Sequence, residues 1–113
     1  MDAAKRNADI NNINNAEFLV ADLSKVGYLN AVTKIASKID LVVLDPPRQG
    51  AAGVMSWVVK SRAKQIIYIS CHPSTMVRDA GVLIESGYKL KHLGVMDMFP
   101  HTTHVESMAV FEL

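Results

Sequence analysis

Two short apolar runs, each stopped by a proline-containing loop, constrain the fold of this chain more than any other feature. The first is IDLVVL at residues 39–44, followed by DPPRQG, and the second is QIIYIS at 65–70, followed by CHPST. Short continuous runs rich in β-branched residues are typical of parallel strands covered on both faces. The residues between them predict a helix over Ala52–Ser61. A strand, a helix and a second strand in this order favour an α/β fold with a largely parallel sheet.

The rest of the pattern predicts further elements on both sides of this unit. Towards the N-terminus we expect a surface helix and loop over Ala3–Asn15, a buried strand in AEFLVADL that ends at Asp22, and a helix over Lys25–Ser37 capped by Ser24. Towards the C-terminus we expect a helix over Ser74–Ser86 that Gly87 ends, then strands in YKLKHLGVMDMF and HVESMAVFEL. The 113 residues are enough for one small domain.

Composition excludes few classes of function. Lys plus Arg number 12 and Asp plus Glu number 11, so no strong basic excess marks a nucleic-acid-binding surface, although a local patch would suffice. One cysteine forms no internal disulfide, which favours a reducing, cytoplasmic location. No apolar run has the length of a membrane span, so we expect no membrane partner.

All four prolines fall in three loops, DPPRQG, SCHPST and DMFPHTTHVE. Each loop follows a predicted strand, and ligands bind at the carboxyl ends of strands in open α/β sheets. In the middle loop, Pro73 suits a first helical turn and Ser74 and Thr75 suit a cap, so Cys71 lies just before a helix. A helix N-terminus favours a reactive thiolate. The alternative is a small buried apolar residue, the commoner role of a lone cysteine.

The other two loops offer carboxylates. Asp45 is either a turn residue or a ligand-binding carboxylate at the end of its strand. Glu106 begins an apolar strand, where it is either a half-buried group that transfers protons or a solvent-facing residue. Asp97, His101 and His104 accompany Glu106, but their spacing is weak evidence for a metal site, and we expect none.

Together the three loops resemble those of the RNA (uracil-5-)-methyltransferases of the RumA/TrmA type. The matching segments are DPPRQG (45–50), YISCHPSTMVRDAGVLIESGY (68–88) and DMFPHTTHVESMAVFEL (97–113), the last being most similar to members that act on large-subunit ribosomal RNA. The segment AAKRNADINNINNAEFLVADL is also similar to the family. The resemblance implies a Rossmann-like fold that uses S-adenosylmethionine, and an RNA substrate, ribosomal or transfer RNA.

The resemblance also implies roles for individual residues. Cys71 would be the nucleophile that adds to carbon 6 of uracil, and Glu106 the base that removes the proton from carbon 5. Asp45 would lie near the cofactor and bind the target uracil, with Arg48 and Pro73 also contacting the substrate. Asp22 would contact the cofactor's adenosine.

The family carries elements that this sequence lacks: a glycine-rich cofactor loop, the strand after it, and an RNA-binding barrel. We therefore expect residues 1–113 to be the C-terminal portion of a catalytic domain, N-terminally truncated, with weak cofactor binding and self-association through exposed strand edges. Two other functions stay open. They are an amino-group methyltransferase that uses the Asp-Pro-Pro loop and a non-catalytic scaffold that keeps only the fold.

Overall fold

The computed structural model describes residues 1–23, 25, 27–35, 37–97 and 105–113. The chain divides into two compact units, Met1–Ser37 and Lys38–Leu113, and each is described by itself. No helix in these described ranges is long and apolar enough to cross a membrane.

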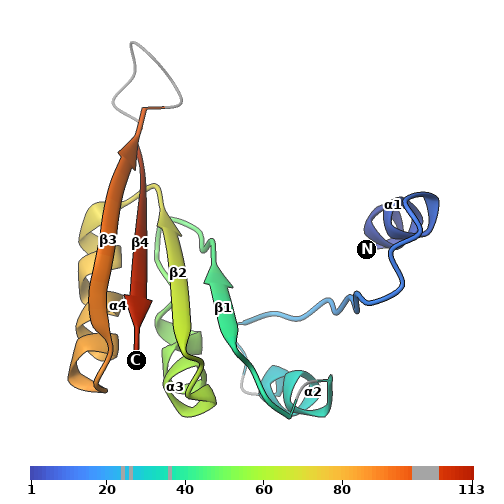
Figure 1. Cartoon of the computed structure of the whole chain (residues 1–113), viewed down its shortest axis with the longest axis horizontal. Helices are drawn as coiled ribbons and strands as arrows, with labels where there is room; N and C mark the ends of the chain where they lie inside the picture. The colour runs from blue at the N-terminus through green and yellow to red at the C-terminus, as the bar shows by residue number, and fades with distance from the viewer. Residues whose placement is uncertain (24, 26, 36, 98–104) are drawn as a thin grey trace. The chain divides into compact units, whose positions relative to one another are not determined.

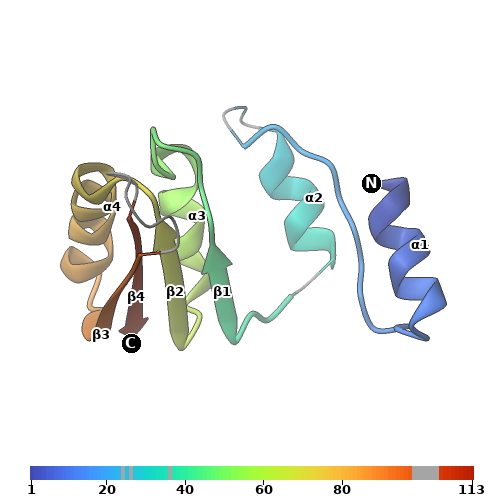
Figure 2. The ribbon, with the colours of Figure 1, turned by 90° about the horizontal axis from the view of Figure 1, so that it is seen from above.

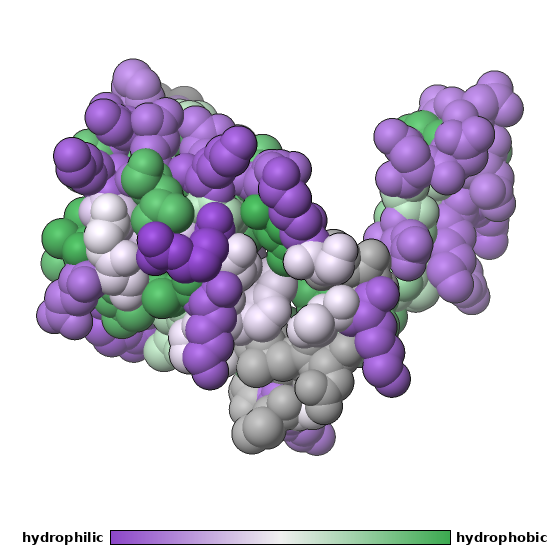
Figure 3. Space-filling view, turned by 60° about the horizontal axis from the view of Figure 1, so that its bottom comes forward, coloured by the Kyte–Doolittle hydropathy of each residue, from purple (hydrophilic) through white to green (hydrophobic). Residues whose placement is uncertain are grey.

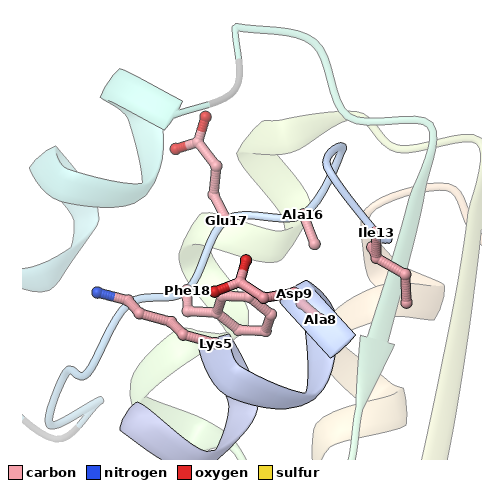
Figure 4. A pocket seen from close by; sticks show the side chains of 7 residues that line it. All are labelled: Lys5, Ala8, Asp9, Ile13, Ala16, Glu17 and Phe18. Atoms are coloured by element: carbon pink, nitrogen blue, oxygen red, sulfur yellow. The ribbon is translucent and has the colours of Figure 1, made fainter. Parts of the chain in front are cut away.

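The first unit contains two helices, α1 (Asp2–Ile10) and α2 (Tyr28–Ile35). The visible face of α1 is mainly hydrophilic (Figure 3), and Ala8 is its buried residue. A shallow pocket of about 380 Å³ lies between α1 and the segment that follows it. In this pocket the ring of Phe18 lies beside the side chains of Lys5 and Asp9 (Figure 4).

The strand predicted in AEFLVADL is wrong. Residues 16–22 form neither helix nor strand, and Phe18, Leu19 and Val20 are 37, 44 and 75% exposed. A strand needs a neighbour for its backbone hydrogen bonds, and every strand in the described residues pairs within the second unit. The helix predicted over Lys25–Ser37 is confirmed in a shorter form as α2, and its predicted cap Ser24 lies outside the described residues.

The second unit contains six elements, nearly all as predicted. They are β1 (Leu41–Leu44), α3 (Ala52–Ser61), β2 (Gln65–Ser70), α4 (Pro73–Glu85), β3 (Lys89–Met96) and β4 (Glu106–Glu112). Gly87, which follows the C-cap residue Ser86 of α4, has φ +102°, and this suits the predicted glycine stop.

The four strands form one sheet in the order β1-β2-β4-β3. The β1–β2 pair is parallel, whereas β4 is antiparallel to both β2 and β3, so the prediction of a largely parallel sheet is wrong. The connections explain the difference. Helix α3 carries the chain back between β1 and β2, but no helix separates β3 from β4 in the described residues, and strands joined without a crossover run antiparallel.

Helices α3 and α4 both cover the same face of the sheet (Figures 1 and 2). The core lies between these two helices and the sheet. Its fully buried side chains include Val58, Ile66, Tyr68, Leu83 and Phe111. The opposite face keeps apolar residues exposed: Leu41 is 46% and Val43 is 56% exposed. Because α3 and α4 both follow their strands across one face, this unit has a covered face and an open face.

Candidate active site

The strands bring two of the three predicted loops to the same edge of the sheet. Strands β1 and β2 end there and β4 begins there (Figure 1). Ser70 pairs with Ser107 in the antiparallel β2–β4 register. Cys71 follows Ser70 and Glu106 precedes Ser107, so these two residues lie in the segments next to this last pair. The parallel β1–β2 pairing brings the loop that starts at Asp45 beside the loop that holds Cys71.

Cys71 is a free, half-buried thiol between β2 and α4. Ser70, which is buried, holds the turn around it: its Oγ donates to the His72 carbonyl and accepts from the His72 N–H, both at 2.9 Å. Helix α4 begins directly afterwards, with Pro73 in its first turn and His72 as its N-cap. The prediction that Cys71 immediately precedes a helix is confirmed.

Ser74 and Thr75 do not cap this helix, contrary to our expectation, because α4 starts one residue earlier than predicted and both already belong to its first turn. The Oγ of Ser74 lies 2.9 Å from Nδ1 of His72 instead. Thr75 Oγ1 lies 3.0 Å from the carbonyl oxygens of both His72 and Arg48, so the single proton of this hydroxyl is shared between two acceptors. Thr75 thereby joins the Cys71 loop to the DPPRQG loop.

Asp45 and Glu106 both lie at this edge of the sheet. Glu106 is half-buried and shares its strand face with Met108, which is 37% exposed. Asp45 follows β1 directly and is exposed. Cys71 follows β2, so the two carboxylates and the thiol lie in neighbouring segments at one edge of the sheet.

The DPPRQG loop is held against α4 by its backbone. Arg78 Nη2 donates to the Gln49 carbonyl at 2.8 Å, and the Ala51 N–H donates to Asp79 Oδ2 at 2.7 Å. Gly50 lies between these two contacts with φ +84°, a conformation that favours glycine. Its N–H closes a turn onto the Pro47 carbonyl at 2.9 Å.

Asp79 is 1% exposed, and donors occupy both of its carboxylate oxygens. Oδ2 also accepts from the hydroxyl of Tyr68 at 2.5 Å, and Oδ1 lies 3.1 Å from Nε and Nη2 of Arg78. Burial raises the pKa of Tyr68, and the hydrogen bond to the Asp79 carboxylate raises it further. Tyr68 therefore stays protonated and acts as a donor at any ordinary pH.

Sequence reasoning missed Ser70 and Asp79, and it did not predict that Thr75 contacts the DPPRQG loop. A signal for Asp79 existed, because it falls at helical spacing between Met76 and Leu83, the two buried apolar residues of α4. A carboxylate on the buried stripe of a helix needs partners, and that requirement was readable from the sequence.

The described structure does not place Asp22, His101 or His104 at this edge of the sheet. Asp22 belongs to the first unit. Of the residues weighed for a metal site, His101 and His104 lie outside the described residues. Within the described ranges no group of three His, Cys, Asp or Glu side chains could hold a metal ion.

Comparison with known proteins identifies the family of this chain. The sequence pattern of the tRNA (Uracil-5-)-methyltransferases matches residues 1–112, nearly the whole chain. The chain belongs to that family. The family resemblance expected from the three loops is thereby confirmed, and it extends through the first unit as well.

Curated relatives in the family are similar over nearly all of this chain. The 23S rRNA (uracil(1939)-C(5))-methyltransferase RlmD of Aeromonas salmonicida is 50% identical over 109 residues, 96% of this chain and 24% of the relative. The enzyme of the same name from Hahella chejuensis is 51% identical over 108 residues, with 94% and 24% covered. That from Pseudomonas putida is 46% identical over 112 residues, with 99% and 24% covered. The chain thus spans about a quarter of the length of these relatives.

Solved methyltransferase structures share the family's fold. The delta-N METTL16 MTase domain is 16% identical, with a TM-score of 0.55 over 98% of this chain and 56% of that one. Human methyltransferase 10 domain containing protein is 15% identical, with a TM-score of 0.54 over 98% and 55%. At this level of identity the likeness concerns the fold alone, and it confirms the Rossmann-like methyltransferase fold.

Proposed function

We propose that this chain carries the catalytic loops of an enzyme that methylates carbon 5 of a uridine in RNA, through a covalent bond to Cys71. The observation that carries the proposal is the strand register: Ser70 pairs with Ser107, so the segments that contain Cys71 and Glu106 adjoin at one edge of the sheet. Family membership indicates the reaction class, and the names of the curated relatives indicate carbon 5 of uracil as the atom that is methylated.

Each chemical step can be assigned to a residue at this edge. Carbon 5 of uracil is a weak nucleophile until the Cys71 thiolate adds to carbon 6, which places an electron pair on carbon 5 as an enolate. After carbon 5 has gained a methyl group, Glu106 removes the proton that this carbon still bears. The electron pair of that C–H bond re-forms the double bond and expels the Cys71 sulfur. The thiol group and the pyrimidine ring are thereby regenerated.

At this edge Asp45 fits S-adenosylmethionine: it is an exposed carboxylate next to the Cys71 loop. Carboxylates accept hydrogen bonds from amino groups and ribose hydroxyls, so Asp45 would hold such a group of the cofactor. For Asp22, an exposed carboxylate in the first unit, we propose a contact with the adenosine on the family resemblance alone. When bound, S-adenosylmethionine supplies the methyl group. Asp45 would also accept a hydrogen bond from the target uracil.

The substrate we propose is ribosomal or transfer RNA in the cytoplasm. Uracil in a duplex has carbon 6 stacked between neighbours, so the base must leave the stack to reach Cys71. Arg48 is exposed, begins a turn in the DPPRQG loop and offers a guanidinium for phosphate contacts. Pro73 is exposed directly after the Cys71 turn, where its ring can pack against a base.

Covalent trapping tests the proposal. RNA that contains 5-fluorouridine is incubated with the protein and S-adenosylmethionine. Because carbon 5 carries fluorine in place of the proton that the base removes, the methylated adduct stays attached to sulfur, and peptide mass spectrometry should locate it at Cys71. Cys71→Ala should form no adduct. RNA methylation that survives Cys71→Ala would favour an amino-group methyltransferase, and absence of both adduct and methylation would favour a non-catalytic scaffold.

The 113 residues by themselves should bind S-adenosylmethionine weakly, since they correspond to about a quarter of the relatives' length. Calorimetric titration measures this affinity, and tight binding would contradict the expectation. Strand β1 ends the sheet order β1-β2-β4-β3, and its outer edge offers backbone groups to a second copy of the chain. We propose self-association through such edges. A molar mass that stays monomeric as concentration rises would refute it.

A further inference from the structure

A polar cluster joins the DPPRQG loop to helix α4, and the proposed chemistry does not use it. We call it the Asp79 cluster, and its members are Tyr68, Thr75, Arg78 and Asp79. The cluster binds three consecutive parts of the loop backbone. Thr75 binds the Arg48 carbonyl, Arg78 binds the Gln49 carbonyl, and Asp79 binds the Ala51 N–H, at 3.0, 2.8 and 2.7 Å.

We propose that Asp79 is a positioning residue that fixes Asp45 relative to Cys71. The inference rests on the proposed function, which requires both residues to meet one uracil. The loop held by Asp79 starts at Asp45, and the helix that carries Asp79 starts two residues after Cys71. A displacement of the loop against α4 therefore changes the distance between the residue that binds the uracil and the residue that attacks it.

The buried charge makes this connection stiff. Asp79 is 1% exposed, and its oxygens are occupied by Tyr68 from β2, by Ala51 from the loop, and by its neighbour Arg78. Moving the loop would leave a buried carboxylate partly unpaired, which costs far more than losing a solvent-exposed hydrogen bond. The β1–β2 pairing, in contrast, ends at Leu44 and Tyr68, so the strands do not hold the loop beyond that point.

The close approach of loop and helix also depends on Gly50. A Cβ atom at this position would lie 2.7 Å from Asp79 Oδ2 and 3.1 Å from the Thr75 Cβ. The absence of a side chain lets the loop backbone reach the carboxylate directly. The loop therefore approaches the Asp79 cluster this closely only because residue 50 has no side chain.

The test compares two tyrosine variants that are matched in burial and in bonding. Tyr68→Phe removes the hydroxyl that binds Asp79, whereas Tyr88→Phe removes a hydroxyl that donates to the Ala63 carbonyl at 2.7 Å. Tyr68 and Tyr88 are 0 and 1% exposed. Each variant therefore loses one buried hydrogen bond, but only the first touches the cluster.

Two measurements separate positioning from general destabilisation. Hydrogen exchange of the Ala51 amide reports whether the loop is held, independently of any activity. The second measurement is a ratio: the rate at which Cys71 is trapped by 5-fluorouridine RNA, divided by the rate at which iodoacetamide alkylates Cys71. Alkylation needs only an accessible thiol, whereas trapping needs the thiol and the loop together.

We expect Tyr68→Phe to speed Ala51 exchange and to lower the trapping-to-alkylation ratio, each by roughly tenfold. Tyr88→Phe should leave both within about twofold of the parent protein. Equal effects of the two variants on Ala51 exchange, or a trapping ratio unchanged in Tyr68→Phe, would overturn the inference. If the parent protein forms no adduct, the proposed function fails, and Ala51 exchange alone still decides whether the Asp79 cluster holds the loop.

Discussion

A Cβ atom on Gly50 would lie 2.7 Å from Oδ2 of the buried Asp79 and 2.5 Å from Nη2 of Arg78, closer than real side-chain contacts allow. Gly50 also has φ +84°, which an L-residue adopts only with strain. We therefore predict that Gly50→Ala lowers the free energy of unfolding by roughly 1–3 kcal/mol, because the loop must move away from α4. Urea denaturation measures the change.

Gly81 provides the matched control for this substitution. It lies within α4, where a Cβ atom meets nothing within 4 Å. Gly81→Ala should raise the free energy of unfolding by roughly 0.5–1 kcal/mol, since alanine restricts the unfolded chain and favours helix. If the two substitutions changed stability in the same direction, the described close approach of Gly50 to α4 would be wrong.

Removing the Asp79 carboxylate should cost more stability than removing only its charge. Asp79→Ala leaves the Tyr68 hydroxyl and the Ala51 N–H buried without an acceptor, and we expect a loss of roughly 2–5 kcal/mol in the free energy of unfolding. Asp79→Asn keeps an acceptor oxygen and should lose roughly 1–2 kcal/mol. Thermal and urea unfolding would show this order, and equal losses would contradict it.

Comparing Glu106→Gln with Glu112→Gln tests whether Glu106 is the base that removes the carbon 5 proton. Both belong to β4 and are half-buried, but Glu106 begins the strand at the Cys71 edge and Glu112 ends it at the opposite edge. Under the proposed mechanism, Glu106→Gln cannot remove the carbon 5 proton, so turnover should fall roughly 10²–10⁴-fold. The methylated RNA should then stay attached to Cys71 even with ordinary uridine. Glu112→Gln should retain parent activity and leave no adduct on a denaturing gel.

The sequence predicted well those parts of the fold that local pattern determines. Helix α3 and strand β2 match their predicted bounds, because a short β-branched run and a helix between turn residues carry their own signals. The strand predicted near Asp22 is wrong, since strand formation depends on a neighbour that no local pattern can specify. Similarly, Asp45 and Cys71 were marked by the loops that contain them. For Asp79 the helical spacing indicated a buried carboxylate, but its partners Tyr68 and Ala51 lie on other segments that no local pattern could identify.

The hydroxyl of Ser70 should matter for reactivity more than for stability. It donates to the His72 carbonyl and accepts from the His72 N–H, so it closes the turn that contains Cys71. Ser61 makes the same pattern at the end of α3, donating to the Val58 carbonyl at 2.6 Å and accepting from the Ala63 N–H at 3.3 Å. Ser70→Ala and Ser61→Ala should each lower the free energy of unfolding by about 1–2 kcal/mol.

Only Ser70→Ala should alter the rate at which 5-fluorouridine RNA is trapped. Without the hydroxyl, the turn samples orientations in which the thiol does not face the base, and a misplacement of about 1 Å can cost roughly 10²-fold in rate. The rate should therefore fall in Ser70→Ala and stay at the parent value in Ser61→Ala. Equal trapping by both variants would mean that the backbone of β2 and α4 aims the sulfur without help from Ser70.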